Sequence, residues 1–159
     1  MESAKGFTLI ELLIAMVVLA IGLSIAVPGF TSFIEKGRAE SQRESLVTAL
    51  SLARSEAVKR GATVTIAPLS GSNWSSGWTV KVGTTTLREF PALQRATLNR
   101  SASGYTGTLQ FNSRGQLEGA TLAQSTVFEF RVSGDYCAYE RDITINSMGR
   151  VAVTARSCS

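Results

Sequence analysis

The sequence predicts an α+β protein in which one long N-terminal helix packs on a C-terminal antiparallel β-sheet domain. Three observations support this fold class. An uncharged apolar run occupies residues 12–30, apolar residues recur at helical spacing over residues 41–60, and the pattern changes to alternation after Gly61. Spacings of three and four are typical of an amphipathic helix, and alternation is typical of half-buried strands. A length of 159 residues suits a single domain with an appendage.

The apolar run near the N-terminus is the first predicted element. Its 19 uncharged residues, 12–30, approach the roughly 20 that a membrane-spanning helix needs. A secretory signal peptide has a shorter apolar region followed by a small-residue cleavage site, so we predict a retained membrane helix. Glu11 is the exception, because a carboxylate at the bilayer centre costs about 2.5–3.5 kcal/mol on insertion scales. It is either a functional residue or a carboxylate resting in the headgroup layer.

The helix is predicted to continue beyond the apolar run. Pro28 lacks a backbone donor, so a kink is expected there. Residues 41–60 then carry an apolar stripe that should cover a sheet. The stripe consists of Leu46, Leu50, Ala53 and Ala57, widened by Val47 and Val58. Lys59, Arg60 and Gly61 provide a helix stop.

Short alternating segments separated by glycine and serine follow the helix. The predicted strands are Thr63–Ile66, Thr79–Val82, Thr108–Phe111, Val127–Val132, Ile143–Ile145 and Val151–Val153. Strands that follow one long helix in this way indicate an α+β domain with an antiparallel sheet. The aromatic residues between them are predicted to lie in the core: Trp74, Trp78, Phe90 and Tyr105. No strand is followed by a dinucleotide-binding or phosphate-binding glycine pattern, so nucleotide binding has no support.

The composition excludes most enzyme chemistry. The chain contains no histidine, which removes a histidine general base, a Ser–His–Asp triad and a histidine-ligated metal. Two cysteines cannot build a tetrahedral zinc site. Asp135, Glu140 and Asp142 cluster in the sequence but lack the spacing of a calcium loop, so we interpret them as a polar loop. We therefore expect no catalytic residue, no metal and no cofactor, and do not expect an enzyme.

The two cysteines lie 21 positions apart, at Cys137 and Cys158. Outside the cytoplasm they should form a disulfide that stabilises the domain by roughly 3 kcal/mol, whereas in the cytosol they would remain thiols. Lys5 precedes the apolar run, which agrees with a cytoplasmic N-terminus under the positive-inside rule. We predict the bond.

The N-terminal segment GFTLIELLIAMVVLAIGLSIAVPGF resembles the start of a type IV prepilin. The resemblance implies that a dedicated prepilin peptidase and methyltransferase cuts after Gly6 and N-methylates Phe7. It assigns assembly roles to Glu11 and Pro28. It also implies a domain organisation in four parts: a leader over 1–6, a membrane and filament-core helix over 7–30, an amphipathic half-helix over 31–61, and a periplasmic or extracellular β-rich domain over 62–159.

Motifs further along the chain resemble the GspH/FimT group, and its FimT/FimU-type minor pilins in particular. They are ARSEAVKRG at 53–61, the W-x-x-G-W pattern from Trp74 to Trp78, the F-x-x-x-G pattern from Phe111 to Gly115, and the glycine–arginine pair before the last strand. The resemblance implies a subunit that primes filament assembly at the pilus tip, in filaments used for twitching motility, adhesion and DNA uptake. Its implied partners are other minor pilins, the major pilin, the assembly platform and the inner membrane. The subunit would be a single-pass inner-membrane protein before assembly and would reach the cell surface afterwards.

Two alternatives to this function stay open. The first is a GspH-like pseudopilin of a type II secretion system, which has the same leader and helix. The second is a DNA-binding minor pilin, since some FimT-like pilins contact DNA through a C-terminal G-R-x-R element. Here Arg150 matches the first arginine, Ala152 stands where the second is expected, and Arg156 lies four residues later. Two cations would give only weak, salt-sensitive binding to phosphates.

Overall fold

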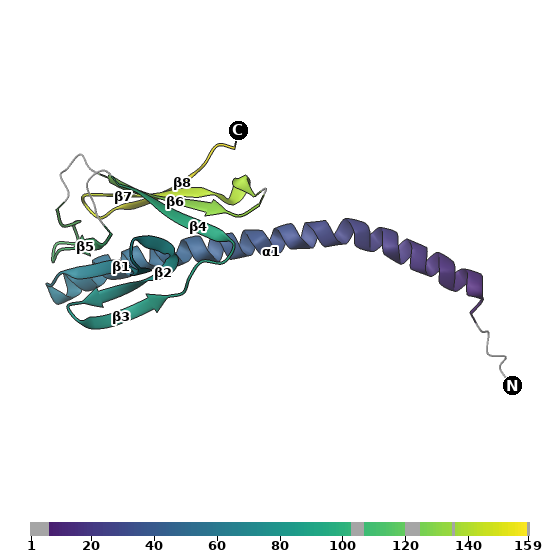
Figure 1. Cartoon of the computed structure of the whole chain (residues 1–159), viewed down its shortest axis with the longest axis horizontal. Helices are drawn as coiled ribbons and strands as arrows, with labels where there is room; N and C mark the ends of the chain where they lie inside the picture. Colours follow the sequence, from purple (N-terminus) through teal and green to yellow (C-terminus); the bar gives the residue numbers. More distant parts are fainter. Residues whose placement is uncertain (1–6, 103–106, 120–124, 135, 159) are drawn as a thin grey trace. The chain divides into compact units, whose positions relative to one another are not determined.

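The computed structural model describes residues 7–102, 107–119, 125–134 and 136–158. One helix, two four-stranded sheets and a short 3-10 turn make up this part of the chain (Figure 1). The elements in order are α1 (Leu9–Arg60), β1 (Val64–Ser70), β2 (Asn73–Val82), β3 (Thr85–Phe90), β4 (Ala96–Ala102), β5 (Leu109–Phe111), β6 (Ser125–Val132), η1 (Cys137–Tyr139), β7 (Arg141–Asn146) and β8 (Val151–Ala155). The chain divides into two compact units, Met1–Arg38 and Ala39–Ser159, which are described separately.

The first unit contains the N-terminal part of α1, whose apolar side chains are exposed. Their exposed fractions range from 42% at Ile34 to 85% at Phe7. Within the described residues, α1 is the one helix long and apolar enough to cross a membrane, and none of its most apolar window is buried. The helix assignment runs through Pro28 without interruption. The predicted kink at Pro28 stays a prediction.

The second unit is built around residues 39–60 of α1. The predicted stripe is buried: Leu46, Leu50, Ala53 and Ala57 have exposed fractions of at most 1%. Ala39 and Ala49 extend it. The helix ends in a Schellman motif, in which Gly61 has a φ of +62° and the amide of Ala62 donates to the carbonyl of Ala57 over 3.2 Å. The predicted helix stop is therefore confirmed.

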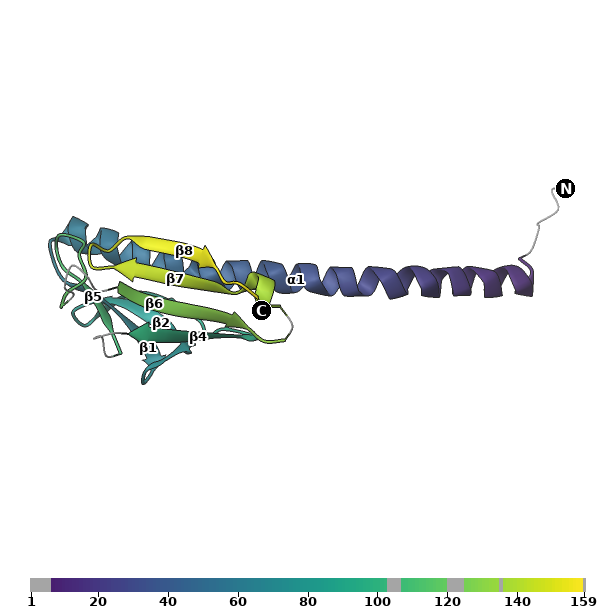
Figure 2. The ribbon, with the colours of Figure 1, turned by 90° about the horizontal axis from the view of Figure 1, so that it is seen from above.

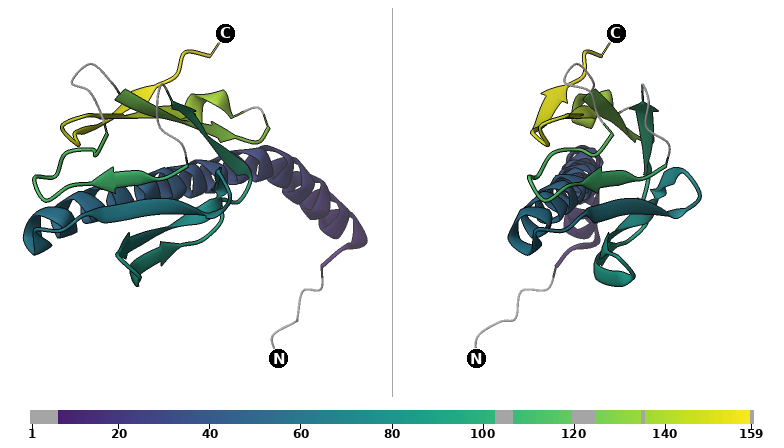
Figure 3. Two further views of the ribbon diagram at one scale, coloured as in Figure 1. Left: turned by 60° about the vertical axis from the view of Figure 1, so that its left-hand side comes forward. Right: turned by 90° about the vertical axis from the view of Figure 1, so that its left-hand side faces the viewer.

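The strands form two antiparallel sheets, with the orders β3-β2-β1-β5 and β4-β6-β7-β8. Figures 2 and 3 show the sheets along the C-terminal part of the helix. Their inner faces and the helix stripe form one hydrophobic core. The aromatic prediction is confirmed for Trp74, Trp78 and Phe90, each at most 4% exposed, whereas Tyr105 lies outside the described residues. The Trp74 and Phe128 rings meet edge to face with centroids 4.8 Å apart.

The structure confirms all six predicted strands, five of them longer than predicted and the Thr108–Phe111 strand one residue shorter, and corrects two points. The predicted antiparallel β-sheet domain is confirmed, with its strands in two sheets, but the strands β3 and β4 were not predicted. Val58 was wrongly placed in the buried stripe, because 54% of its surface is exposed. Its side chain lies on the flank of the helix, where it lines a groove described below.

Candidate functional site

The start of α1 holds the residues for which the sequence predicted an assembly role. Thr8 and Glu11 form a capping box: the amide and hydroxyl of Thr8 donate to Glu11 Oε2 over 2.9 and 2.8 Å, and the amide of Glu11 donates to Thr8 Oγ1 over 3.3 Å. The reciprocal bonds satisfy orphan donors of the first helical turn. Thr8 was missed in the sequence reasoning, although a threonine three positions before a glutamate ahead of an apolar run is the signature of this cap.

The capping box holds the Glu11 carboxylate through one of its two oxygens and leaves the other free to accept a hydrogen bond. Both Thr8 donors bind Oε2, so Oε1 has no hydrogen-bond donor among the described residues. Phe7 lies directly before the cap and is 85% exposed, while Gly6 lies outside the described residues. The site therefore presents an acidic group with one available oxygen at the tip of an exposed apolar helix.

At the C-terminal end of the domain, Cys137 and Cys158 form the predicted disulfide, with their Cα atoms 5.8 Å apart. Arg131 of β6 binds Asp142 over 3.0 Å and Glu129 over 2.8 Å. Burial alone would lower the pKa of Arg131, but the hydrogen bonds and charges of Asp142 and Glu129 hold that pKa above its ordinary value. The guanidinium therefore keeps its charge at any physiological pH.

The acidic cluster near Cys137 was interpreted as a polar loop. Glu140 and Asp142 instead pair with Arg131, at 3.6 and 3.0 Å, while Asp135 lies outside the described residues. Among the described residues, no group of three or more His, Cys, Asp or Glu side chains is arranged to hold a metal ion. The disulfide joins the C-terminal segment to η1, and the ion pairs of Arg131 join β6 to β7 and to Glu140.

The two arginines predicted as DNA contacts lie in different surroundings. Arg150 is exposed after the β7–β8 turn, where its amide donates to Asn146 Oδ1 over 2.9 Å. Arg156 Nη1 lies 4.0 Å from Glu129 and Asp142, two carboxylates that also bind Arg131. Among the described residues, Arg150 and Arg156 share no contact partner, and DNA binding stays a prediction.

Two of the motifs that indicated the family meet on the helix. Arg54 Nε donates to the carbonyl of Gly115 over 3.1 Å, and the amide of Leu117 donates to the carbonyl of Ser147 over 2.9 Å. Gly149 has a φ of +73°, and a Cβ atom there would lie 2.3 Å from the Gly115 carbonyl oxygen. The backbones of the two turns thus approach so closely that only glycine fits at position 149. Arg54 is a positioning residue that the sequence reasoning did not single out.

A comparison with protein-family profiles matches the part of the chain that carries these contacts. The profile described as Type II transport protein GspH matches residues 42–149, which includes the buried helix stripe, the tryptophan strand and both glycine turns. This chain belongs to the GspH family. The profile described as the prokaryotic N-terminal methylation motif matches residues 1–27. The GspH-family chain is therefore a structural pilin-type subunit with a processing motif, and not an enzyme.

Solved structures support the fold of this GspH-family chain. The type IV minor pilin FimU of Pseudomonas aeruginosa, in one crystal form, is 24% identical, with a TM-score of 0.65 over 77% of this chain and 92% of that chain. A second crystal form of the same protein is 24% identical, with a TM-score of 0.62 over 72% and 91% of the two chains. At this identity the likeness establishes the fold. A comparison with curated proteins returned no match.

Proposed function

We propose that this chain is a minor pilin of a type IV pilus, cleaved after Gly6 and N-methylated at Phe7, that takes part in priming the filament and in its tip complex. The observation that carries the proposal is Glu11, an acidic residue at the start of an otherwise apolar and exposed helix. Exposed apolar side chains over more than five helical turns need lipid or other helices around them. A membrane first and a filament core later provide both environments.

Maturation gives Glu11 a partner. Cleavage after Gly6 creates an ammonium group on Phe7, four positions before Glu11. When two parallel helices are shifted along their axes by about this distance, the ammonium of one lies beside Glu11 of the other. In a packed filament the ammonium of one subunit can bind Glu11 of the next, through the Oε1 atom that the capping box leaves available. Any other axial register leaves a buried charge unpaired, at a cost of about 3–5 kcal/mol. The acidic residue then sets the register of the subunit.

The substitution Glu11→Ala tests this proposal. The variant should insert in the inner membrane like the native chain, because it removes a charge from an apolar segment. Its incorporation into filaments should fall by more than about tenfold, since the buried ammonium then lacks its partner. Glu40→Ala is the matched control, because it removes an exposed carboxylate from the same helix. Incorporation of the Glu11→Ala variant at the native level would contradict the register role.

The maturation step has its own measurement. The intact mass of the chain recovered from filaments should correspond to a polypeptide that begins at Phe7 and carries one added methyl group. Recovery of a functional chain with Met1 still attached would contradict the proposed processing.

The description of the family profile favours a second candidate, a pseudopilin of a type II secretion system. Both candidates use the same processing motif and helix, so they differ only in the machine that is assembled. Deletion of the gene separates them. Loss of surface filaments with unchanged protein secretion supports the pilus, and the reverse result supports the secretion system.

A further inference from the structure

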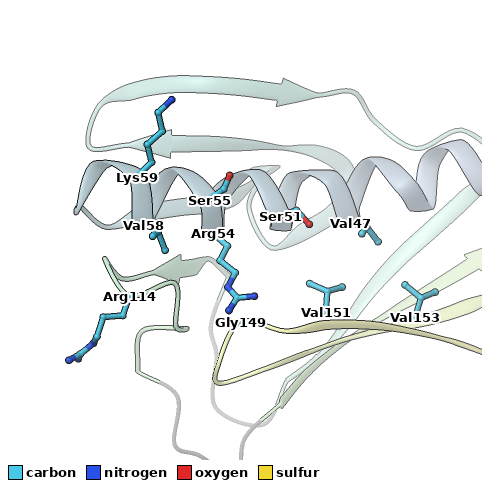
Figure 4. Close-up of a pocket in the computed structure, with 10 residues that line it drawn as sticks. All are labelled: Val47, Ser51, Arg54, Ser55, Val58, Lys59, Arg114, Gly149, Val151 and Val153. Carbon is cyan, nitrogen blue, oxygen red and sulfur yellow. The ribbon is translucent and has the colours of Figure 1, made fainter.

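A groove runs along the second unit between the helix and the last strand (Figure 4). It has a volume of about 720 Å³. Val47 and Val58 of α1 line one wall, and Val151 and Val153 of β8 line the other. Val58 is 54% exposed and Val153 is 41% exposed, so the groove leaves apolar surface open to solvent. A contiguous apolar surface of this kind marks an interaction site more often than isolated exposed residues do.

The backbone of β8 is also open on this side. β8 is an edge strand, paired only with β7 in the part of the chain that the structure describes. The amide of Asn146 donates to the carbonyl of Arg150 over 3.1 Å, and antiparallel hydrogen bonding then alternates along the hairpin. In this register the amide and carbonyl groups of Val151 and Val153 point away from β7. The same two residues therefore offer apolar side chains to the groove and free backbone groups at its rim.

The other edge strands of the two sheets are protected against pairing. β3 carries Arg88 and Glu89 and lies beside a register shift, β4 carries Arg100, and β5 has only three residues. β8 has five residues, Val151–Ala155, without charge or proline. Natural edge strands are normally blocked by charges, bulges or short length. An unblocked edge beside an apolar groove is suited to receive another strand.

Charge determines which strand fits. Arg54 points into the end of the groove beside Gly149, and Arg114 lies at its mouth (Figure 4). Only the Nε of Arg54 has a protein acceptor among the described residues, so its terminal nitrogens can donate to a ligand. No carboxylate is found among the described residues that line the groove. A carboxylate on the incoming segment would complete this end of the site.

We propose that β8 and the groove bind an extended segment of a different filament subunit, with apolar side chains at alternate positions and a carboxylate beside Arg54 and Arg114. The segment adds to β8 as a further strand, so main-chain hydrogen bonds contribute affinity and the groove selects alternate side chains. A second copy of this chain fits less well, because its net charge of +4 opposes the cationic end of the groove. The proposal rests on the proposed function and specifies the chemistry of the partner.

Peptide binding to the full chain in detergent micelles tests the proposal. The probe is a short capped peptide in which threonine and valine alternate and which ends in glutamate. One control peptide carries lysine in place of the glutamate. Another is N-methylated at alternate amides, so it cannot pair with a strand. The glutamate peptide should bind best, and it should slow hydrogen exchange at the amides of Val151 and Val153. Equal binding of all three peptides, or unchanged exchange at these amides, would overturn the proposal.

Two matched substitutions on β8 separate the groove from general damage to the strand. Val153→Glu places a charge in the apolar part of the groove and should weaken the glutamate peptide by at least about tenfold, because the apolar side chains of the peptide would then desolvate this charge. Thr154→Glu makes the same charge change on the opposite face of the strand and should alter affinity by less than about twofold. Similar losses in both variants would contradict binding in the groove.

A charge reversal at the mouth gives a result that loss of folding cannot imitate. Arg114→Glu should reverse the preference, so that the lysine peptide binds more tightly than the glutamate peptide. An unchanged preference would show that charge does not select the partner. The peptide-binding results are independent of the filament assays on Glu11→Ala. Either the proposed peptide site or the proposed filament function can therefore be contradicted while the other stands.

Discussion

The two halves of α1 differ in pattern and have opposite surroundings: the first is a nearly continuous apolar run and the second is amphipathic. Up to Ile34, the large apolar side chains are exposed within the described chain, and Leu19 is 64% exposed. From Ala39 onward, one face is covered by two sheets, and Leu50 is completely buried. The second unit therefore supplies its own core, whereas the first requires lipid or neighbouring subunits. The amphipathic half thus contributes a buried stripe to the domain, whereas the continuous apolar run of the first half stays exposed in the single chain.

Polar groups differ between the two units in the same way. Glu11 has a donor on Thr8 and an available second oxygen, so its hydrogen bonding is incomplete in the single chain. Arg131 has three carboxylates within 3.6 Å, so its charge is neutralised within the domain. The open Glu11 oxygen is therefore available to a partner outside the single chain, whereas the Arg131 cluster is paired within the domain.

Truncation of one leucine in each half tests this comparison directly. Leu50→Ala should lower the free energy of unfolding of the second unit by about 2–5 kcal/mol, because it leaves a cavity in a closed core. Leu19→Ala should change it by less than about 0.5 kcal/mol. Urea unfolding of the full chain in detergent, followed by the fluorescence of Trp74 and Trp78, reports on the second unit. Equal losses in the two variants would show that the exposed half also stabilises the domain.

The disulfide provides the second test of the self-contained unit. Replacing Cys137 and Cys158 with serine should cost about 3 kcal/mol, the entropy of closing a loop of this length. The loss should appear in the tryptophan unfolding transition and leave membrane insertion of the first unit unchanged. Reduction of the native chain is the control, and it should shift the same transition by the same amount. A serine variant as stable as the oxidised chain would contradict the prediction.

The sequence predicted the elements whose patterns are local. The helix stripe, the helix stop and six strands follow from spacing within a few residues, and the disulfide follows from the cysteine count. The strand β3 was missed because it lies at an edge beside a register shift between Val80 and Lys81, so its side chains do not alternate. The strand β4 was missed because the inward position Arg100 interrupts its apolar alternation.

Features that join distant parts of the chain could not be predicted. The groove requires β8 to lie beside residues 47–58, about one hundred positions earlier, and periodicity indicates faces without indicating neighbours. The bond from Arg54 to Gly115 and the close approach of Gly149 have the same origin. The Thr8–Glu11 cap is different, because its signature is local and was present in the sequence.

Glycines allow the finest test of the difference between the two units. A Cβ atom at Gly149 would lie 2.3 Å from the Gly115 carbonyl oxygen, whereas a Cβ atom at Gly22 has no neighbour within 4 Å. Gly149→Ala should therefore destabilise the second unit by about 2 kcal/mol, from backbone strain and the collision together.

Gly119→Ala is the control for backbone strain, since Gly119 has a φ of +76° and open space around its Cβ position. It should cost about 1 kcal/mol, and the difference from Gly149→Ala measures the collision. Gly22→Ala should leave unfolding of the second unit unchanged, because its helix needs no glycine in the single chain. If Gly22→Ala nevertheless prevents filament incorporation, a neighbouring subunit must pack closely against that helix face. If it neither destabilises the domain nor impairs incorporation, no neighbouring subunit packs closely against the helix at Gly22. The apolar surface of the first unit is then buried without a close helix–helix contact at this position.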